Sequence, residues 1–99
     1  MPHIINWTET ARVGLENAYL FLAEKNQDAA IAAIKSIREK ALLLKQFPNA
    51  GRPAEDLEPE HRELLIPFGS AGYVLLYHFA ESGNAITVLA IKHQKEVGY

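Results

Sequence analysis

Ionisable side chains suited to phosphodiester chemistry gather near the C-terminal end of the sequence. Lys92, His93 and Lys95 follow an apolar segment, and Tyr99 comes shortly after them. Cleavage of RNA by its own 2′-hydroxyl needs a general base, a general acid and a cation beside the scissile phosphate. His93 or Tyr99 could transfer the protons, and Arg62, Lys92 and Lys95 could hold the phosphate. The residue types therefore permit nuclease chemistry but do not specify it.

The same residues also have a structural explanation. Ionisable groups at sheet edges and in tails are common in proteins without catalytic activity, and this applies to His93 and Tyr99. His78 lies inside an apolar segment, where a hydrogen-bonded structural histidine is more common than a catalytic one. On the sequence alone both explanations of His93 and Tyr99 stay open.

Metal, cofactor and nucleophilic-serine sites find little support. His3, His61, His78 and His93 are scattered, without the His-x-x-x-His spacing that places two ligands on one helix face. The Gly-Ser-Ala-Gly segment at 69–72 is typical of a turn between two strands rather than of a phosphate-binding loop. We therefore expect neither a metal nor a cofactor.

Length and composition predict one small globular domain over residues 1–99. The chain has 99 residues, 48% of them hydrophobic and 22% charged, and it has no cysteine, which suits a reducing compartment. The net charge is −2 and the pI is about 6.1, whereas proteins that bind polyphosphates broadly are usually basic. The apolar stretches are shorter than the roughly 20 residues of a membrane span, and no secretory leader is evident. A cytoplasmic protein is expected.

The first half of the sequence predicts a short strand and two helices. Residues 4–7 form an apolar run, and Thr8 can then cap a helix whose first turn carries Glu9. Gly14 interrupts this helix and predicts a close crossing. One face of the helix is apolar, and it consists of Ala11, Leu15, Ala18, Tyr19 and Leu22.

The second helix has a regular apolar seam formed by Ala30, Ile34, Ile37, Ala41 and Leu44. Ile31, Leu42 and Leu43 widen the apolar surface beyond this seam. Contact with both the first helix and the sheet is the simpler explanation, and an apolar strip for a partner is the alternative. Pro48 then ends the helical region.

The segment Gly51-Arg52-Pro53 lies in a loop rich in proline and acidic residues, where it is expected to have a structural role. Arg52 is expected to fix this loop by bonding carbonyls or a carboxylate rather than to contact a target. Three apolar strands are predicted after the loop, over residues 62–68, 73–79 and 85–95, with short turns between them and a cluster of cations at the end of the last strand.

These strands carry apolar residues on both faces. Val88 and Ala90 are assigned to one face of the last strand, and Leu89 and Ile91 to the other. The two helices can cover one face of such a sheet, and a chain this short has little left for the other. Another protein chain is the simplest cover, so an obligate protein partner is expected.

The order of these segments resembles the RelE/ParE superfamily of bacterial toxins, and most of all its ParE branch. The resemblance covers nearly the whole chain and is carried by the segments FPNAGRP (47–53), REL (62–64), YVLLY (73–77) and IKHQK (91–95). It implies an α+β fold in which a helical hairpin packs on a small antiparallel sheet, in the order β-α-α-β-β-β. It also implies a toxin of a type II toxin–antitoxin module, neutralised by a ParD-like antitoxin that reads DNA in its place.

The resemblance leaves the target open. ParE-like members poison DNA gyrase without breaking bonds themselves, which would make Arg62, Lys92, His93 and Lys95 target-binding residues. RelE-like members cleave mRNA on the ribosome, and Arg62, His93 and Tyr99 would then be catalytic. An inactive relative that only binds its antitoxin is the third possibility. The acidic balance of the chain favours the ParE-like activity.

Overall fold

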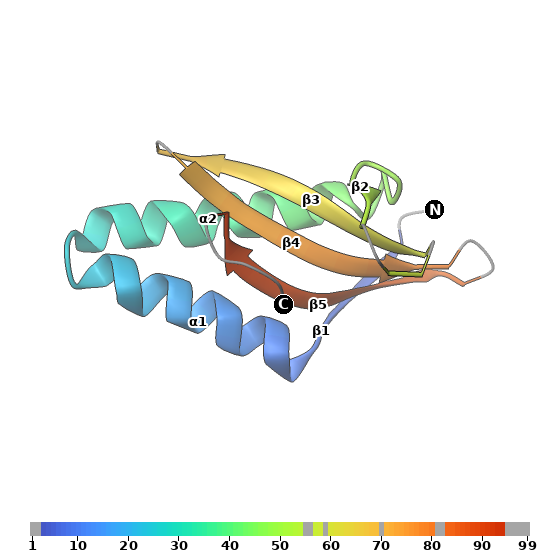
Figure 1. The fold of residues 1–99 in the computed structure, drawn as a ribbon, viewed down its shortest axis with the longest axis horizontal. Helices are drawn as coiled ribbons and strands as arrows, with labels where there is room; N and C mark the ends of the chain where they lie inside the picture. The colour runs from blue at the N-terminus through green and yellow to red at the C-terminus, as the bar shows by residue number, and fades with distance from the viewer. Residues whose placement is uncertain (1–2, 55–56, 59, 70, 81–82, 95–99) are drawn as a thin grey trace.

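The computed structural model describes residues 3–54, 57–58, 60–69, 71–80 and 83–94. Lys95 and Tyr99, two of the residues singled out by the sequence, lie outside the described residues. The elements, in chain order, are β1 (Ile4–Trp7), α1 (Glu9–Ala23), α2 (Gln27–Leu43), β2 (Arg52–Pro53), β3 (His61–Phe68), β4 (Ala71–Phe79) and β5 (Ala85–His93). This is the predicted α+β fold, with one additional short strand in the loop after α2 (Figure 1).

The five strands form one sheet in the order β1-β5-β4-β3-β2. Strands β2 to β5 pair antiparallel, whereas β1 runs parallel to β5 and closes the other edge. The parallel pairing follows from connectivity, because the helical hairpin carries the chain away from β1 and the two hairpins that follow bring β5 back beside it. The sheet is thus antiparallel in its centre and mixed at the β1 edge.

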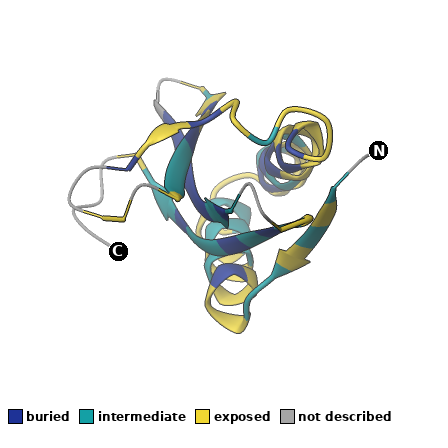
Figure 2. Cartoon of the chain, turned by 90° about the vertical axis from the view of Figure 1, so that its right-hand side faces the viewer, coloured by how far each residue is buried: buried dark blue, intermediate teal, exposed yellow. Residues whose placement is uncertain are grey.

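The helical hairpin covers one face of the sheet. α1 contacts β5 and α2 contacts β3, and a single core cluster joins the helices to the strands. In Figure 2 the sides of the helices that face the sheet are buried and their outer sides are exposed. On β4, every second residue belongs to this core: Tyr73, Leu75, Tyr77 and Phe79.

A β-bulge in the β4–β5 pair changes which residues of β5 face the helices. Leu76 pairs with Ala90, but the next residue of β4, Tyr77, pairs with Val88. Leu89 is the extra residue, so Val88 and Ile91 both join the core beneath the helices. The assignment of Val88 and Ala90 to one face was therefore wrong, because a strict two-residue alternation does not survive a bulge.

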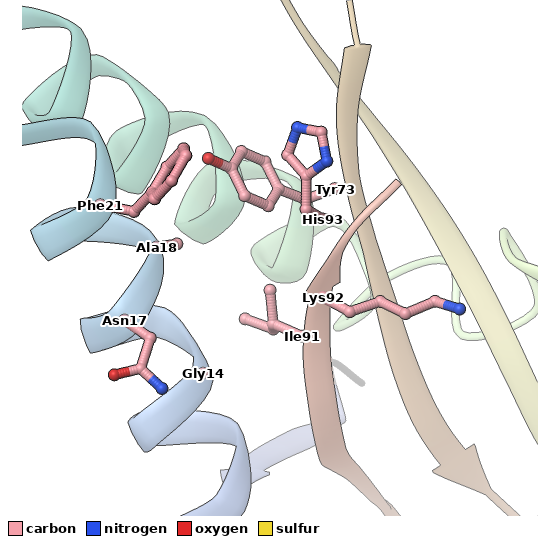
Figure 3. A pocket seen from close by; sticks show the side chains of 8 residues that line it. All are labelled: Gly14, Asn17, Ala18, Phe21, Tyr73, Ile91, Lys92 and His93. Atoms are coloured by element: carbon pink, nitrogen blue, oxygen red, sulfur yellow. The ribbon is translucent and has the colours of Figure 1, made fainter. Parts of the chain in front are cut away.

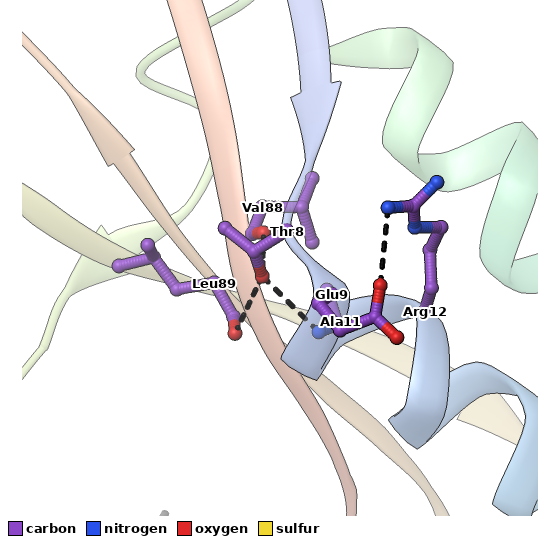
Figure 4. Close-up of polar contacts among 6 residues, drawn as sticks. All are labelled: Thr8, Glu9, Ala11, Arg12, Val88 and Leu89. Atoms are coloured by element: carbon purple, nitrogen blue, oxygen red, sulfur yellow. Dashed lines mark hydrogen bonds and ion pairs between the residues drawn. The ribbon is translucent and has the colours of Figure 1, made fainter.

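Thr8 fastens the start of α1 to this bulge (Figure 4). Its hydroxyl oxygen accepts a hydrogen bond from the Ala11 N–H at 3.1 Å, as an N-cap should. The same hydroxyl lies 2.9 Å from the Val88 carbonyl oxygen and 3.1 Å from that of Leu89, so its single proton can be donated to either. The Thr8 side chain thereby caps α1 and also ties the start of this helix to the bulge in β5.

We expect Thr8→Ala to lower the free energy of unfolding by about 1–2 kcal/mol, because it removes the cap and the bond to β5 together. Urea denaturation measures this loss. Thr10→Ala is the matched control, since Thr10 is exposed on the same helix turn. Equal effects of the two substitutions would contradict the anchoring role of Thr8.

The exposed apolar surface lies mainly on the helices. Val74 and Leu76, on the sheet face away from the helices, are already only 3% and 6% exposed. By contrast, Ile31 and Leu42 on α2 are 53% and 57% exposed, and Leu43 is exposed as well. The simpler explanation of these three α2 residues, contact with α1 and the sheet, was wrong, and the surface that lacks a cover lies on the helices.

Candidate functional site

The end of β5 places Lys92 and His93 on opposite faces of the sheet. His93 pairs with Tyr73, whose side chain belongs to the core beneath the helices. Lys92 pairs with Val74 and so faces the other side. Figure 3 shows the consequence, with the His93 ring beside Tyr73 and the Lys92 side chain directed away from α1. The two side chains therefore point to opposite faces of the sheet, although both residues line the groove at this end of β5.

A groove of about 490 Å³ runs between α1 and the ends of β4 and β5. We refer to it as the β5 groove, and its lining residues are Gly14, Asn17, Ala18, Phe21, Tyr73, Ile91, Lys92 and His93 (Figure 3). Its shape depends on the small residues of α1. A Cβ atom at Gly14 would lie 2.8 Å from the Ile91 carbonyl oxygen, which explains the close crossing predicted for this glycine.

Aromatic side chains line both sides of the β5 groove. The His93 ring stands edge-on to the Tyr73 ring, with their centroids 5.6 Å apart. Across the groove Phe21 is exposed, and the ammonium of Lys25 lies 4.9 Å from its ring centroid. Such a groove can accept an apolar or aromatic side chain of a partner and offers a histidine and an amide beside it. Asn17 and Phe21 were missed by the sequence analysis, although their spacing from Gly14 along α1 already places the three on one helix face.

Arg62 lies at a different place on the sheet. It pairs with Tyr77, whereas His93 pairs with Tyr73, so about 13 Å of β4 separates the two positions. The Arg62 guanidinium donates a hydrogen bond of 2.7 Å to the Gly51 carbonyl oxygen. The set Arg62, Lys92 and His93, suggested by residue type, is therefore spread over two faces and two ends of the sheet.

Around Arg62 lies a hydrogen-bond network that holds the loop after α2. The hydroxyl of the fully buried Tyr77 donates to the Pro48 carbonyl oxygen at 2.7 Å and accepts from the Gly51 N–H at 2.9 Å. Burial raises the pKa of the Tyr77 hydroxyl above 10.0, while the Gly51 N–H and the positive charge of Arg62 act in the opposite direction. The tyrosine is thereby kept protonated as a structural donor.

The segment Gly51-Arg52-Pro53 is held against β3 as the short strand β2. Arg52 pairs with Glu63 in the sheet, and its Nε lies 3.3 Å from a carboxylate oxygen of the same residue. This contact is of the kind expected for Arg52 from the sequence. A Cβ atom at Gly51 would lie 2.6 Å from the Glu63 carbonyl oxygen, so only glycine fits between β3 and Tyr77.

His78 faces away from the helices and pairs with His61 across β3 and β4. The two rings stand edge to face with centroids 5.2 Å apart, and His78 Nε2 lies 3.5 Å from a Glu60 carboxylate oxygen. Within the described part of the chain, no group of three potential ligands could hold a metal ion. No helix in that part is long and apolar enough to cross a membrane.

Comparison with known structures agrees with this fold. A chain of the chromosomal ParDE toxin–antitoxin system from P. aeruginosa superposes with a TM-score of 0.73 at 24% identity, covering 94% of this chain and 97% of that one. For the toxin–antitoxin complex RelBE2 from Mycobacterium tuberculosis the TM-score is 0.65 at 20% identity, with 94% and 99% coverage. A mutant of the E. coli toxin RelE in its free state gives a TM-score of 0.68 at 13% identity, with 96% and 86% coverage.

A sequence-family model identifies the branch of the superfamily to which the chain belongs. Residues 5–98 match the model of the ParE toxin of the type II toxin–antitoxin system parDE. This match includes both helices, β2 to β5, β1 from its second residue onward, and the loop held by Tyr77 and Arg62. The chain therefore belongs to the ParE toxin family of type II toxin–antitoxin systems.

Proposed function

We propose that this ParE-family toxin acts by binding DNA gyrase, so that it stabilises the cleaved-DNA state and blocks replication. The observation that carries the proposal is the separation of the ionisable residues. Arg62 donates a hydrogen bond to the Gly51 carbonyl oxygen and pairs with Tyr77, about 13 Å along β4 from Tyr73, with which His93 pairs. The Lys92 side chain faces the other side of the sheet. Nuclease chemistry needs such groups around one phosphate, whereas a binding surface can use them separately.

The net charge supports the same activity. A ribonuclease that works on ribosome-bound mRNA approaches a dense array of phosphates, which favours a basic protein. This chain has a net charge of −2. Docking on a protein target does not need a broad basic surface, and the β5 groove offers apolar and aromatic contacts of the kind that dominate protein interfaces.

Supercoiling by purified gyrase, measured with and without this protein, tests the proposal. Inhibition accompanied by trapped cleaved DNA is expected. His93→Ala and Lys92→Glu are expected to weaken the inhibition about tenfold, because both residues line the β5 groove, the proposed docking surface. Lys40→Glu, an exposed position on α2, is the matched control.

Normal supercoiling at a toxin concentration that arrests cells would contradict the gyrase proposal. Transcript cleavage that disappears in His93→Ala would then favour a ribosome-dependent endoribonuclease, for which His93, Arg62 and Tyr99 were the residues suggested by type. Absence of growth arrest on expression without a partner would favour an inactive antitoxin-binding relative.

We further infer that a ParD-like antitoxin neutralises this toxin by covering the exposed apolar surface of the helices. Large apolar residues are exposed there on both α1 and α2, including Leu20, Phe21, Ile31, Leu42 and Leu43. Large exposed apolar side chains of this kind are costly in a free protein and suit a long-lived partner. Sequence-specific DNA binding would be supplied by the antitoxin.

A further inference from the structure

A second groove, with a volume of about 580 Å³, lies between β1, α1 and α2. We refer to it as the β1 groove. Trp7 of β1, Leu15 of α1 and Leu42 of α2 are among the residues that line it. Trp7 and Leu15 are partly buried against the core, whereas Leu42 is 57% exposed. A hollow of this volume has room for a molecule of cofactor size.

Positive charge is concentrated around the β1 groove, although the chain as a whole has a net charge of −2. Arg12 of α1, Arg38 of α2 and Lys45, just after α2, line the groove, and none of the described residues lining it is acidic. Among the described residues, neither Arg38 nor Lys45 forms an ion pair. Arg12 contacts Glu9 at 3.3 Å (Figure 4), but both side chains are well exposed, and such a pair contributes little. All three cations are therefore available to an anionic ligand.

The indole and the cations together select the chemistry of the ligand. An aromatic side chain stacks on any nucleobase, because every base has a π-face. An arginine guanidinium binds phosphate oxygens through two parallel hydrogen bonds, and a lysine binds them as a point charge. Three cations from separate positions match a polyanionic group better than the single carboxylate of a fatty acid. A nucleotide with a chain of phosphates combines the planar ring and the charges in one molecule.

The charge distribution favours a free nucleotide over a strand of DNA or RNA. A strand carries a phosphate at every nucleotide, and proteins that bind it usually have a positively charged path along its backbone. The net charge of −2 does not suit such a path. The β1 groove instead gathers three cations at one place, which suits the clustered charge of a triphosphate.

We propose that the β1 groove is a binding site for a free nucleoside triphosphate. Trp7 stacks on the base, and Leu42 contacts the apolar side of the base and sugar. Arg12, Arg38 and Lys45 bind the phosphates. The site shares no lining residue with the β5 groove, and the proposal does not depend on gyrase as the target.

The fluorescence of Trp7 tests the site, because Trp7 is the single tryptophan of the chain. Titration of the purified toxin with ATP, and separately with GTP, is expected to quench this emission until the site is saturated, since a stacked base contacts the indole. Inorganic triphosphate has no base and should not quench. Adenosine has no phosphates and should bind at least about tenfold more weakly than ATP. Isothermal titration calorimetry repeats each titration without relying on Trp7.

Substitution of single cations tests the phosphate contacts. The Arg38 and Lys45 side chains are exposed, so Arg38→Gln and Lys45→Gln are expected to fold normally. Each should raise the dissociation constant for ATP about tenfold, because each removes one charged hydrogen-bond donor. Lys40→Gln makes the same charge change at an exposed position of α2 outside the groove, and it should leave the dissociation constant within about twofold of wild type.

The absence of both quenching and binding heat at millimolar ATP would overturn the proposal. An unchanged dissociation constant in both Arg38→Gln and Lys45→Gln would do so as well. Equal quenching by inorganic triphosphate and by ATP would show that the base makes no contact with Trp7. A single-stranded oligonucleotide that binds more tightly than ATP, and loses this affinity in Arg38→Gln, would identify the groove as a site for a nucleic acid strand instead.

Discussion

Gly51→Ala is expected to lower the free energy of unfolding by about 3 kcal/mol, near the upper end for an overpacked site. The added methyl would lie 2.6 Å from the Glu63 carbonyl oxygen and 2.8 Å from the Tyr77 hydroxyl. Neither neighbour can yield easily, because one belongs to β3 and the other is a fully buried side chain. Relief therefore requires that β2 separate from β3 or that the Tyr77 hydrogen bonds break. Urea denaturation measures the loss.

Gly83→Ala is the control for this prediction. A Cβ atom at Gly83 has its nearest neighbour, the Ala80 carbonyl oxygen, at 3.5 Å, which is an ordinary contact. This substitution should change the free energy of unfolding by no more than about 0.5 kcal/mol. Similar losses at the two glycines would show that the loop after α2 is not tightly held.

Tyr77→Phe is expected to cost about 2 kcal/mol near neutral pH. It removes the hydrogen bond to Pro48 and leaves the Gly51 N–H, which is buried beside it, without an acceptor. Tyr19→Phe is the matched control, because the contact of the Tyr19 hydroxyl with Gln27 is long, at 3.5 Å, and exposed. A loss of similar size at Tyr19 would contradict the structural role assigned to Tyr77.

The Tyr77 prediction also has a pH dependence. Burial raises the pKa of Tyr77 in the folded protein above its unfolded value of 10.0. As the pH rises past that value the unfolded chain loses this proton first, so the contribution of Tyr77 to stability is complete below about pH 10 and declines above it. The stability difference between wild type and Tyr77→Phe should therefore stay constant up to about pH 9 and narrow as the pH rises above about 10. A constant difference would contradict the raised pKa.

Much of the fold follows from local sequence patterns. The apolar spacing of the two helices, the capping residue Thr8 and the breaker Pro48 each act within a few residues, so the helix positions are evident without tertiary information. The β5 bulge cannot be found in the same way, because it depends on the pairing register between β4 and β5. That single shift decided which of Val88, Ala90 and Ile91 entered the core.

The sequence by itself determined the toxin-like order of elements, the α+β class and the glycine-dependent crossing at Gly14, since these depend on patterns along the chain. Only the tertiary structure decided that Arg62 holds the Gly51 carbonyl while His93 borders the β5 groove. It also decided that Arg12, Arg38 and Lys45 converge on one groove. The physical reason is that side-chain convergence depends on strand register and helix docking, which are fixed by packing between distant segments rather than by neighbouring residues.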